Sequence, residues 1–323
     1  MTQDRLNLAL RRAVEHLDEE LQRFERAFPS SNCQILWADD FQEVHAQLKH
    51  LFKEQKIKAV FPCDSLSHRL FRELGVREFL EDHKVVSSNE AQVQLFVADY
   101  MVAESGQLLF LNRPADYLSQ LHNPALNIVF TTIERILPSP TLLPGALFGG
   151  SPNCRTILVI ADNSRSVLLA HKTHRQALTC IQCGRCQQAC PVDQQLPEDY
   201  YDNVFTGPIG RVVLPFMESI EAYQHVVWNC TLCGACEEVC PLQLPLRDMI
   251  IASRELFSKD DQLDPHQTDR LSKLKKYLLD RSRLNRPAWR KQQTLSKLLP
   301  SSLKDKLHLP KFADRPFNQT SHT

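Results

Sequence analysis

The sequence predicts an α/β domain followed by an all-α helical module, and three observations lead to this fold class. Up to about residue 165, short β-branched apolar runs alternate with helical apolar stripes, a pattern typical of a largely parallel sheet covered by helices. One cysteine motif then occurs twice, at 180–191 and 230–241. After residue 256 the chain becomes strongly basic. The 323 residues therefore divide into an N-terminal helix (1–28), an α/β domain (29–165), a helical module (166–256) and a basic tail (257–323).

The first expected element is one amphipathic helix over residues 2–28, because leucine and valine recur there at steps of three and four. This helix has neither the apolar core nor the cleavage site of a signal peptide. No apolar run in the chain approaches the ~18 residues that a membrane span requires. Lys+Arg and Asp+Glu both total 38, so global charge favours neither nucleic acid nor membrane as a partner. We expect a cytoplasmic protein without a membrane span.

The α/β domain is expected to contain seven strands. They are 33–38, 57–62, 83–88, a hairpin within 100–111 that turns at 104–106, 126–133 and 155–162. A helix should begin at Phe41, capped by Asp39 or Asp40, and another should run from 64 to 74 and end at Gly75.

The strand ends of this domain supply candidates for a ligand or catalytic site, because α/β domains bind ligands at the carboxyl ends of parallel strands. Glu104 lies in the predicted hairpin turn, and Glu134 follows the strand at 126–133. Either carboxylate could act as a general acid or base, and both are weak catalytic candidates. The alternative for residues 104–106 is a turn without function.

The repeated motif, "CIQCGRCQQACP" and "CTLCGACEEVCP", has the C-x2-C-x2-C-x3-C-P spacing that binds a [4Fe–4S] cluster. In two-cluster modules the fourth cysteine of one motif completes the cluster of the other. The two predicted ligand sets are therefore Cys180, Cys183, Cys186 with Cys240, and Cys230, Cys233, Cys236 with Cys190. Gly184 and Gly234 occupy the same place in each loop and are expected at positive φ. A pair of zinc sites and purely architectural clusters are the alternatives.

The segment between the motifs is unusually long, with 39 residues between Cys190 and Cys230. Apolar residues from Val212 to Val227 fall on one helical face there. This pattern predicts an α-helical ferredoxin module rather than a small two-cluster ferredoxin.

Other features of the sequence are less specific. Of the eleven cysteines, three lie outside the motifs, in or beside apolar stretches, and are expected to be buried: Cys33, Cys63 and Cys154. No glycine-rich nucleotide loop is present, so an NAD-dependent reaction is not supported. Residues 270–311 carry 13 Lys and Arg against two Asp; this tail is expected to be solvated, with docking on an acidic partner as the alternative and nucleic acid less favoured.

Several segments resemble a known family. The stretches "LTCIQCGRCQQACPV", "TGPIGRVVLPF" and "CTLCGACEEVCPLQLPLRDMI" are similar to the iron–sulfur subunit of lactate-utilisation complexes, and "VAESGQLLFLN" and "NIVFTTIERILPS" resemble its LUD domain. The resemblance covers most of residues 85–255, with a compact LUD region. It implies an α/β domain related to sugar-phosphate isomerases and CoA-transferases, then a helical ferredoxin module. It also implies two partners, a second LUD protein and a cysteine-rich iron–sulfur protein.

The leading functional hypothesis is an iron–sulfur subunit that carries electrons from L-lactate, or a related 2-hydroxy acid, through two [4Fe–4S] clusters. In a second hypothesis the LUD domain is itself catalytic, in 2-hydroxy acid oxidation or in CoA-transferase- or isomerase-like chemistry. A third is a redox-sensing interaction protein that uses its basic tail.

Overall fold

The computed structural model describes residues 3–29, 32–114, 117–122, 126–143, 145–150, 154–197 and 199–260. The chain separates into two units, residues 1–255 and 256–323. The basic segment predicted at 270–311 lies outside the described residues. The features below belong to the first unit, except for residues 256–260 at the end of the last described helix.

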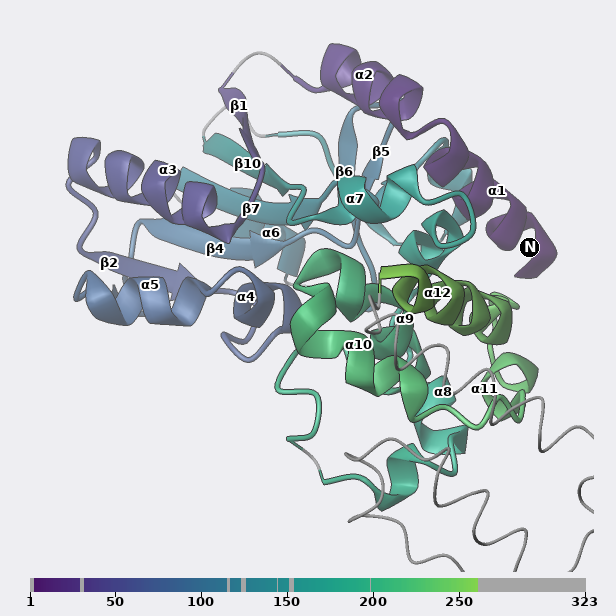
Figure 1. The fold of residues 1–323 in the computed structure, drawn as a ribbon. Helices are drawn as coiled ribbons and strands as arrows, with labels where there is room; N and C mark the ends of the chain where they lie inside the picture. Colours follow the sequence, from purple (N-terminus) through teal and green to yellow (C-terminus); the bar gives the residue numbers. More distant parts are fainter. Residues whose placement is uncertain are drawn as a thin grey trace, which may run out of the picture. The chain divides into compact units, whose positions relative to one another are not determined.

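A six-stranded sheet forms the centre of the α/β domain (Figure 1), and every neighbouring pair in it is parallel. From edge to edge its strands are β1 (Cys33–Ala38), β10 (Arg155–Ala161), β7 (Leu126–Thr132), β4 (Val93–Val97), β2 (Ala59–Pro62) and β3 (Val86–Ser87). All residues of β7 are buried, as expected for a central strand covered on both faces. The predicted parallel α/β sheet is confirmed; β4 was not predicted as a strand.

Helices on the sheet follow the predicted apolar stripes with one change at Gly75. Helix α3 (Phe41–Glu54) begins after Asp40, whose carboxylate accepts the Glu43 N–H at 2.8 Å. The expected helix over 64–74 is shorter, because α4 (Arg69–Glu73) begins only at Arg69. Gly75, at φ +59°, joins α4 directly to α5 (Val76–Asp82) instead of ending a longer helix.

The predicted hairpin is present but belongs to a separate four-stranded sheet. Its strands are, in order, β8 (Ile136–Leu137), β5 (Tyr100–Val102), β6 (Gln107–Phe110) and β9 (Ala146–Phe148). The turn needs Gly106 for two reasons: its φ is +64°, and a Cβ there would lie 2.2 Å from the backbone of Ala27. The end of the N-terminal helical segment can therefore pack directly against the hairpin.

The N-terminal segment consists of two helices, α1 (Gln3–Glu15) and α2 (Leu17–Ala27), rather than the one helix predicted. The break is at His16, with φ −119° and ψ 39°. It follows from two different packing partners. Phe24 of α2 is buried with the second sheet, whereas Asn7 and Arg11 of α1 donate to backbone carbonyls at 241–243 in the helical module.

The helical module contains no strand among its described residues from 165 onward. Its elements are α7 (Arg165–Ala170), η2 (Arg175–Thr179), α8 (Arg185–Ala189), η3 (Asp193–Gln195), α9 (Gly207–Met217), α10 (Ile220–Trp228), α11 (Ala235–Glu238) and α12 (Leu246–Asp260). The predicted stripe between the motifs is divided between α9 and α10, because Glu218 leaves helical geometry and Ser219 caps α10. Val212 and Val227 are fully buried.

Two short elements complete the first unit, α6 (Tyr117–His122) and η1 (Pro140–Leu142). None of the described helices is both long and apolar enough to cross a membrane.

Candidate iron–sulfur centre and an adjoining polar cavity

Both cysteine motifs fold into the same loop. Gln182 and Leu232, two residues after the first cysteine of each motif, have φ +58° and +59°. Each donates its backbone N–H to the sulfur of that cysteine, at 3.3 Å in both loops. Gly184 and Gly234 have φ +73° and +85°, so the positive φ predicted for both is confirmed.

Gly184 shows why glycine occupies this place in the loop. An added Cβ would meet no atom within 4 Å, so space does not exclude a side chain there. The left-handed backbone conformation disfavours a side chain at this position, because L-residues other than glycine adopt that conformation at an energetic cost. Helices α8 and α11 begin directly after the two glycines and pack against each other.

Four cysteines from the two motifs line one cavity, which we call the cysteine cavity. They are Cys180, Cys183, Cys186 and Cys240. Much of the remaining wall is apolar, from residues such as Val204, Ile209 and Leu246. Among the described residues, no three His, Cys, Asp or Glu side chains form a group that could hold a single metal ion. A cubane places its four thiolates on four different irons around a central volume. The donor set and the cavity therefore fit a [4Fe–4S] cluster.

The electrostatic neighbours of the third cysteine in each motif come from both motifs. Burial raises the pKa of Cys186 to about 11, with smaller upward contributions from three thiols: Cys180, Cys183 and Cys240. Burial raises the pKa of Cys236 to about 12, and the thiols that add to it include Cys230, Cys186 and Cys190. Cys240 thus lies near the first motif, whereas Cys236 has neighbours from both motifs, Cys186 as well as Cys190.

The fourth cysteine of each motif, Cys190 or Cys240, accepts from a different kind of hydrogen-bond donor. Cys240 accepts the Leu244 backbone N–H at 3.5 Å. Cys190 lies 3.5 Å from a guanidinium nitrogen of Arg211, which is fully buried and forms a bidentate pair with Asp193 at 2.9 and 3.0 Å. Sequence reasoning missed this pair, although a lone arginine inside the apolar stretch "TGPIGRVVLPF" was a detectable signal.

A second cavity, of about 480 Å³, lies at the carboxyl ends of β4, β7 and β10. We call it the polar cavity. Its wall includes Asp99 after β4, Glu134 and Arg135 after β7, and Arg165 after β10. Two residues of the first cysteine loop, Ile181 and Gln182, also line it. The polar cavity therefore adjoins the cysteine cavity, and Arg69 lines both.

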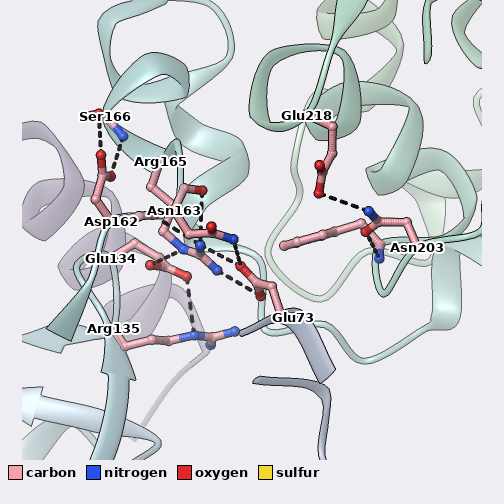
Figure 2. Close-up of polar contacts among 10 residues, drawn as sticks. Glu73, Glu134, Arg135, Asp162, Asn163, Arg165, Ser166, Asn203 and Glu218 are labelled. Carbon is pink, nitrogen blue, oxygen red and sulfur yellow. Dashed lines mark hydrogen bonds and ion pairs between the residues drawn. The ribbon is translucent and has the colours of Figure 1, made fainter. Parts of the chain in front are cut away.

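Arg165 organises the wall of the polar cavity (Figure 2). Its guanidinium lies between Glu73, with nitrogen–oxygen distances of 2.7 and 3.1 Å, and Glu134, at 2.6 Å. Asn163 also donates to Glu73, at 3.0 Å, and Arg135 approaches Glu134 at 3.7 Å. The Arg165 side chain is only 2% exposed and the two glutamates 6% and 5%. These charges are therefore buried and compensated.

Glu134, a predicted catalytic candidate, lies in this network. Burial alone would raise its pKa, but Arg165 and Arg135 outweigh burial and the pKa of Glu134 lies below its usual range. It is held ionised, without the raised pKa that the hypothesis of a catalytic acid or base requires. Glu104, the other candidate, is exposed on the β5–β6 turn and is not part of the polar cavity wall.

Of the three cysteines outside the motifs, Cys154 is buried as predicted, whereas Cys33 and Cys63 are only partly buried.

Residues 176–244 match the family described as 4Fe-4S dicluster domain. The chain is also homologous to proteins named Lactate utilization protein B from Bacillus thuringiensis (strain Al Hakam), Bacillus cereus (strain AH187) and Bacillus anthracis (strain A0248). In each case 35% of 108 aligned residues are identical, covering 33% of this chain and 23% of the relative. The predicted resemblance is confirmed over this stretch, which spans less than a quarter of the relatives' own length.

Among solved structures, a DUF162 family protein from Deinococcus radiodurans is similar to 45% of this chain and 98% of its own, at 13% identity and a TM-score of 0.34. The α/β architecture described above is established by its own parallel strand order.

Proposed function

We propose that this chain is the iron–sulfur electron-transfer subunit of a cytoplasmic complex that oxidises L-lactate or a related 2-hydroxy acid. One observation carries the proposal: cysteines from both repeated motifs surround a single cavity, within a segment that matches a 4Fe-4S dicluster domain. The similarity to Lactate utilization protein B supplies the substrate class. When bound, two [4Fe–4S] clusters would supply one-electron transfer.

The proposed ligands of the first cluster are the cysteines of the cysteine cavity, and those of the second are Cys230, Cys233, Cys236 and Cys190. The loops hold these thiols with backbone N–H groups, at Gln182 and Leu232, that already point at a sulfur. Such hydrogen bonds stabilise the thiolate form and influence cluster potential. Exchange of the fourth ligands would keep the two clusters close, as electron exchange between them requires.

The surface near the motifs favours electron exchange with partner proteins. Cys183 and Cys233 are both exposed. The apolar side chains of Ile181 and Val239 are 38% and 37% exposed, each next to a motif cysteine. The proposed partners are a second LUD protein and a cysteine-rich iron–sulfur protein. Cytoplasmic location is proposed because eight of the eleven cysteines lie in the two cluster motifs, whose thiolates a reducing compartment maintains.

The first experiment tests the electron path. The protein is purified anaerobically with its associated proteins, its visible iron–sulfur absorbance is recorded, and L-lactate is added. We expect bleaching by lactate that air reverses. Bleaching only by a strong chemical reductant would remove lactate from the proposal while leaving the clusters. Absence of iron–sulfur absorbance after anaerobic reconstitution would refute the cluster assignment itself.

A second experiment tests the exchange of fourth ligands through pairs of substitutions. In the variant Cys180→Ala, Cys240→Ala both changes affect one proposed cluster, so about half of the iron should remain. In the matched variant Cys180→Ala, Cys190→Ala each cluster loses a ligand, so little iron should remain. If each motif instead supplied all four ligands of its own cluster, Cys180→Ala, Cys190→Ala would retain about half of the iron and Cys180→Ala, Cys240→Ala would retain little. Iron and sulfide analysis after reconstitution distinguishes the two arrangements.

A further inference from the structure

The polar cavity has the position and size of a small-molecule site. It lies at the carboxyl ends of three parallel strands, where α/β domains bind ligands. Its volume of about 480 Å³ falls within the range of roughly 300–1,000 Å³ typical of such sites. The wall combines apolar side chains, among them Leu70, Val97 and Leu143, with the charged network around Arg165.

The carboxylates of this wall already have partners. Glu73 and Glu134 share Arg165, and Glu134 also faces Arg135. Asp99 accepts the Leu111 backbone N–H at 2.7 Å and lies 3.6 Å from Arg113. These acidic groups therefore do not form a free cation site.

Arg69 is different. Its Nε and Nη2 atoms are buried and have no hydrogen-bond partner among the described residues. One face of the guanidinium is covered by the ring of Phe205, 4.0 Å away. Burial lowers the pKa of Arg69 to about 10, so the group stays charged at neutral pH. Glu73 is a favourable charged neighbour of Arg69, but these two donors have no acceptor among the described residues, and buried donors on a cation are costly to leave unpaired.

The geometry points to a binding site for a small monocarboxylate in the polar cavity, anchored by Arg69 at the wall shared with the cysteine cavity. A guanidinium recognises a carboxylate with parallel N–H donors. The two unpaired donors of Arg69, Nε and Nη2, match the two oxygens of one carboxylate. His68 adds a donor to the same wall: its Nδ1 accepts the Leu70 N–H at 3.2 Å, so the neutral ring carries its hydrogen on Nε2. Such a donor suits a 2-oxo or 2-hydroxy oxygen.

This site also couples to the first cysteine loop. Ile181 and Gln182 line the polar cavity, and Arg69 lines the cysteine cavity. A bound anion would compensate the charge of Arg69 next to the proposed cluster and make its reduction less favourable. By linkage, reduction must weaken anion binding by the same factor. This coupling rests on the proposed function, whereas the binding site itself does not.

The test uses the full chain, reconstituted anaerobically. Pyruvate and L-lactate are titrated calorimetrically, with inorganic phosphate as a separate probe. We expect a monocarboxylate to bind, and Arg69→Gln to weaken that binding roughly 10- to 100-fold. Arg72→Gln, an exposed arginine on the same helix, is the matched control and should bind normally. Leu143→Trp, which fills the cavity from a partly exposed wall position, should also abolish binding and serves if Arg69→Gln fails to fold.

Three results would overturn the inference: no binding of either monocarboxylate to the native protein, binding unaffected by both cavity variants, or binding of phosphate alone. The coupling is measured separately, by redox titration with and without saturating pyruvate. A shift of one cluster to lower potential, absent in Arg69→Gln, is expected; no shift would remove the coupling. If pyruvate binds but lactate never reduces the clusters in the complex, the site stands and the proposed function fails.

Discussion

Replacing Arg165 with methionine should strongly destabilise the protein. The substitution keeps much of the side-chain volume and removes the charge that lies between Glu73 and Glu134, two carboxylates whose side chains are 6% and 5% exposed. Removing one partner of a buried ion pair costs about 3–5 kcal/mol, because the remaining charge is left uncompensated. For a unit of this size each kcal/mol corresponds to about 2–4 °C in Tm. The expected loss is therefore about 6–20 °C.

Thermal unfolding of the anaerobic, cluster-loaded protein at one fixed scan rate measures this loss. Arg155→Met is the matched control, because Arg155 is exposed and only bonds Gln34 at 3.1 Å; it should change Tm by about 1–2 °C at most. Adding Glu73→Gln and Glu134→Gln to the methionine variant removes the uncompensated charges. That triple variant should recover much of the lost stability.

The pH dependence gives an independent check on the cause. In the native protein the pKa of Glu134 is lowered, so its contribution to stability is present above the ordinary carboxyl pKa and is lost as pH falls below about 5. In Arg165→Met, burial dominates with only Arg135 left at 3.7 Å, and the pKa of Glu134 should rise. Relative to the native protein, that variant should gain stability as pH falls from 7 towards 5. A Tm loss below about 2 °C, or a variant with the native pH trend, would refute the reasoning.

Two further predictions concern the helical module. His174 is 1% exposed, and burial lowers its pKa to about 4. The unfolded state therefore binds more protons below pH 6.5, and about 1–2 kcal/mol of stability should be lost between pH 7 and pH 5; a Tm series should show this slope, and an unchanged slope in His174→Gln would contradict it. Gly184→Ala should cost about 1–2 kcal/mol at φ +73° and slow anaerobic cluster reconstitution, measured as absorbance regained over time. Gly149→Ala, at a glycine without positive φ, is the control; equal rates in both variants would count against the loop geometry.

Local sequence patterns were sufficient to predict most strands of the parallel sheet. The β-branched runs at 126–132 and 155–161 formed strands because a strand buried on both faces must be apolar throughout. The apolar run at 33–38 formed the edge strand β1, in which only Ala38 is buried. Asp40 capped its helix through a contact only three residues away. The hairpin around Gly106 was predictable for the same reason, since its turn needs a residue that tolerates positive φ.

The structure differs from the sequence predictions where contacts with residues far away in the chain outweigh the local conformational preference. The periodic helix over 2–28 is broken at His16, because its two parts contact different regions of the first unit. The hairpin belongs to a separate sheet, which no local pattern in its strands indicates. Arg211 and Asp193 were missed because their pairing joins a helix interior to a loop 18 residues earlier.

The sequence by itself determined the chemistry of the motif loops: the thiols, their spacing and the glycines at positive φ. These properties are encoded within a few residues, so motif spacing and backbone preference are enough to predict them. The motif spacing also predicted that Cys240 joins the first motif's cysteines, and Cys240 lines the cysteine cavity with them. Only the tertiary structure placed Arg165 between two glutamates, one of them 92 positions earlier in the chain. It also left two buried donors of Arg69 without a partner among the described residues, beside both cavities. Burial and charge compensation depend on which segments, far apart in the chain, contact each other in the fold, and the local sequence does not specify those contacts.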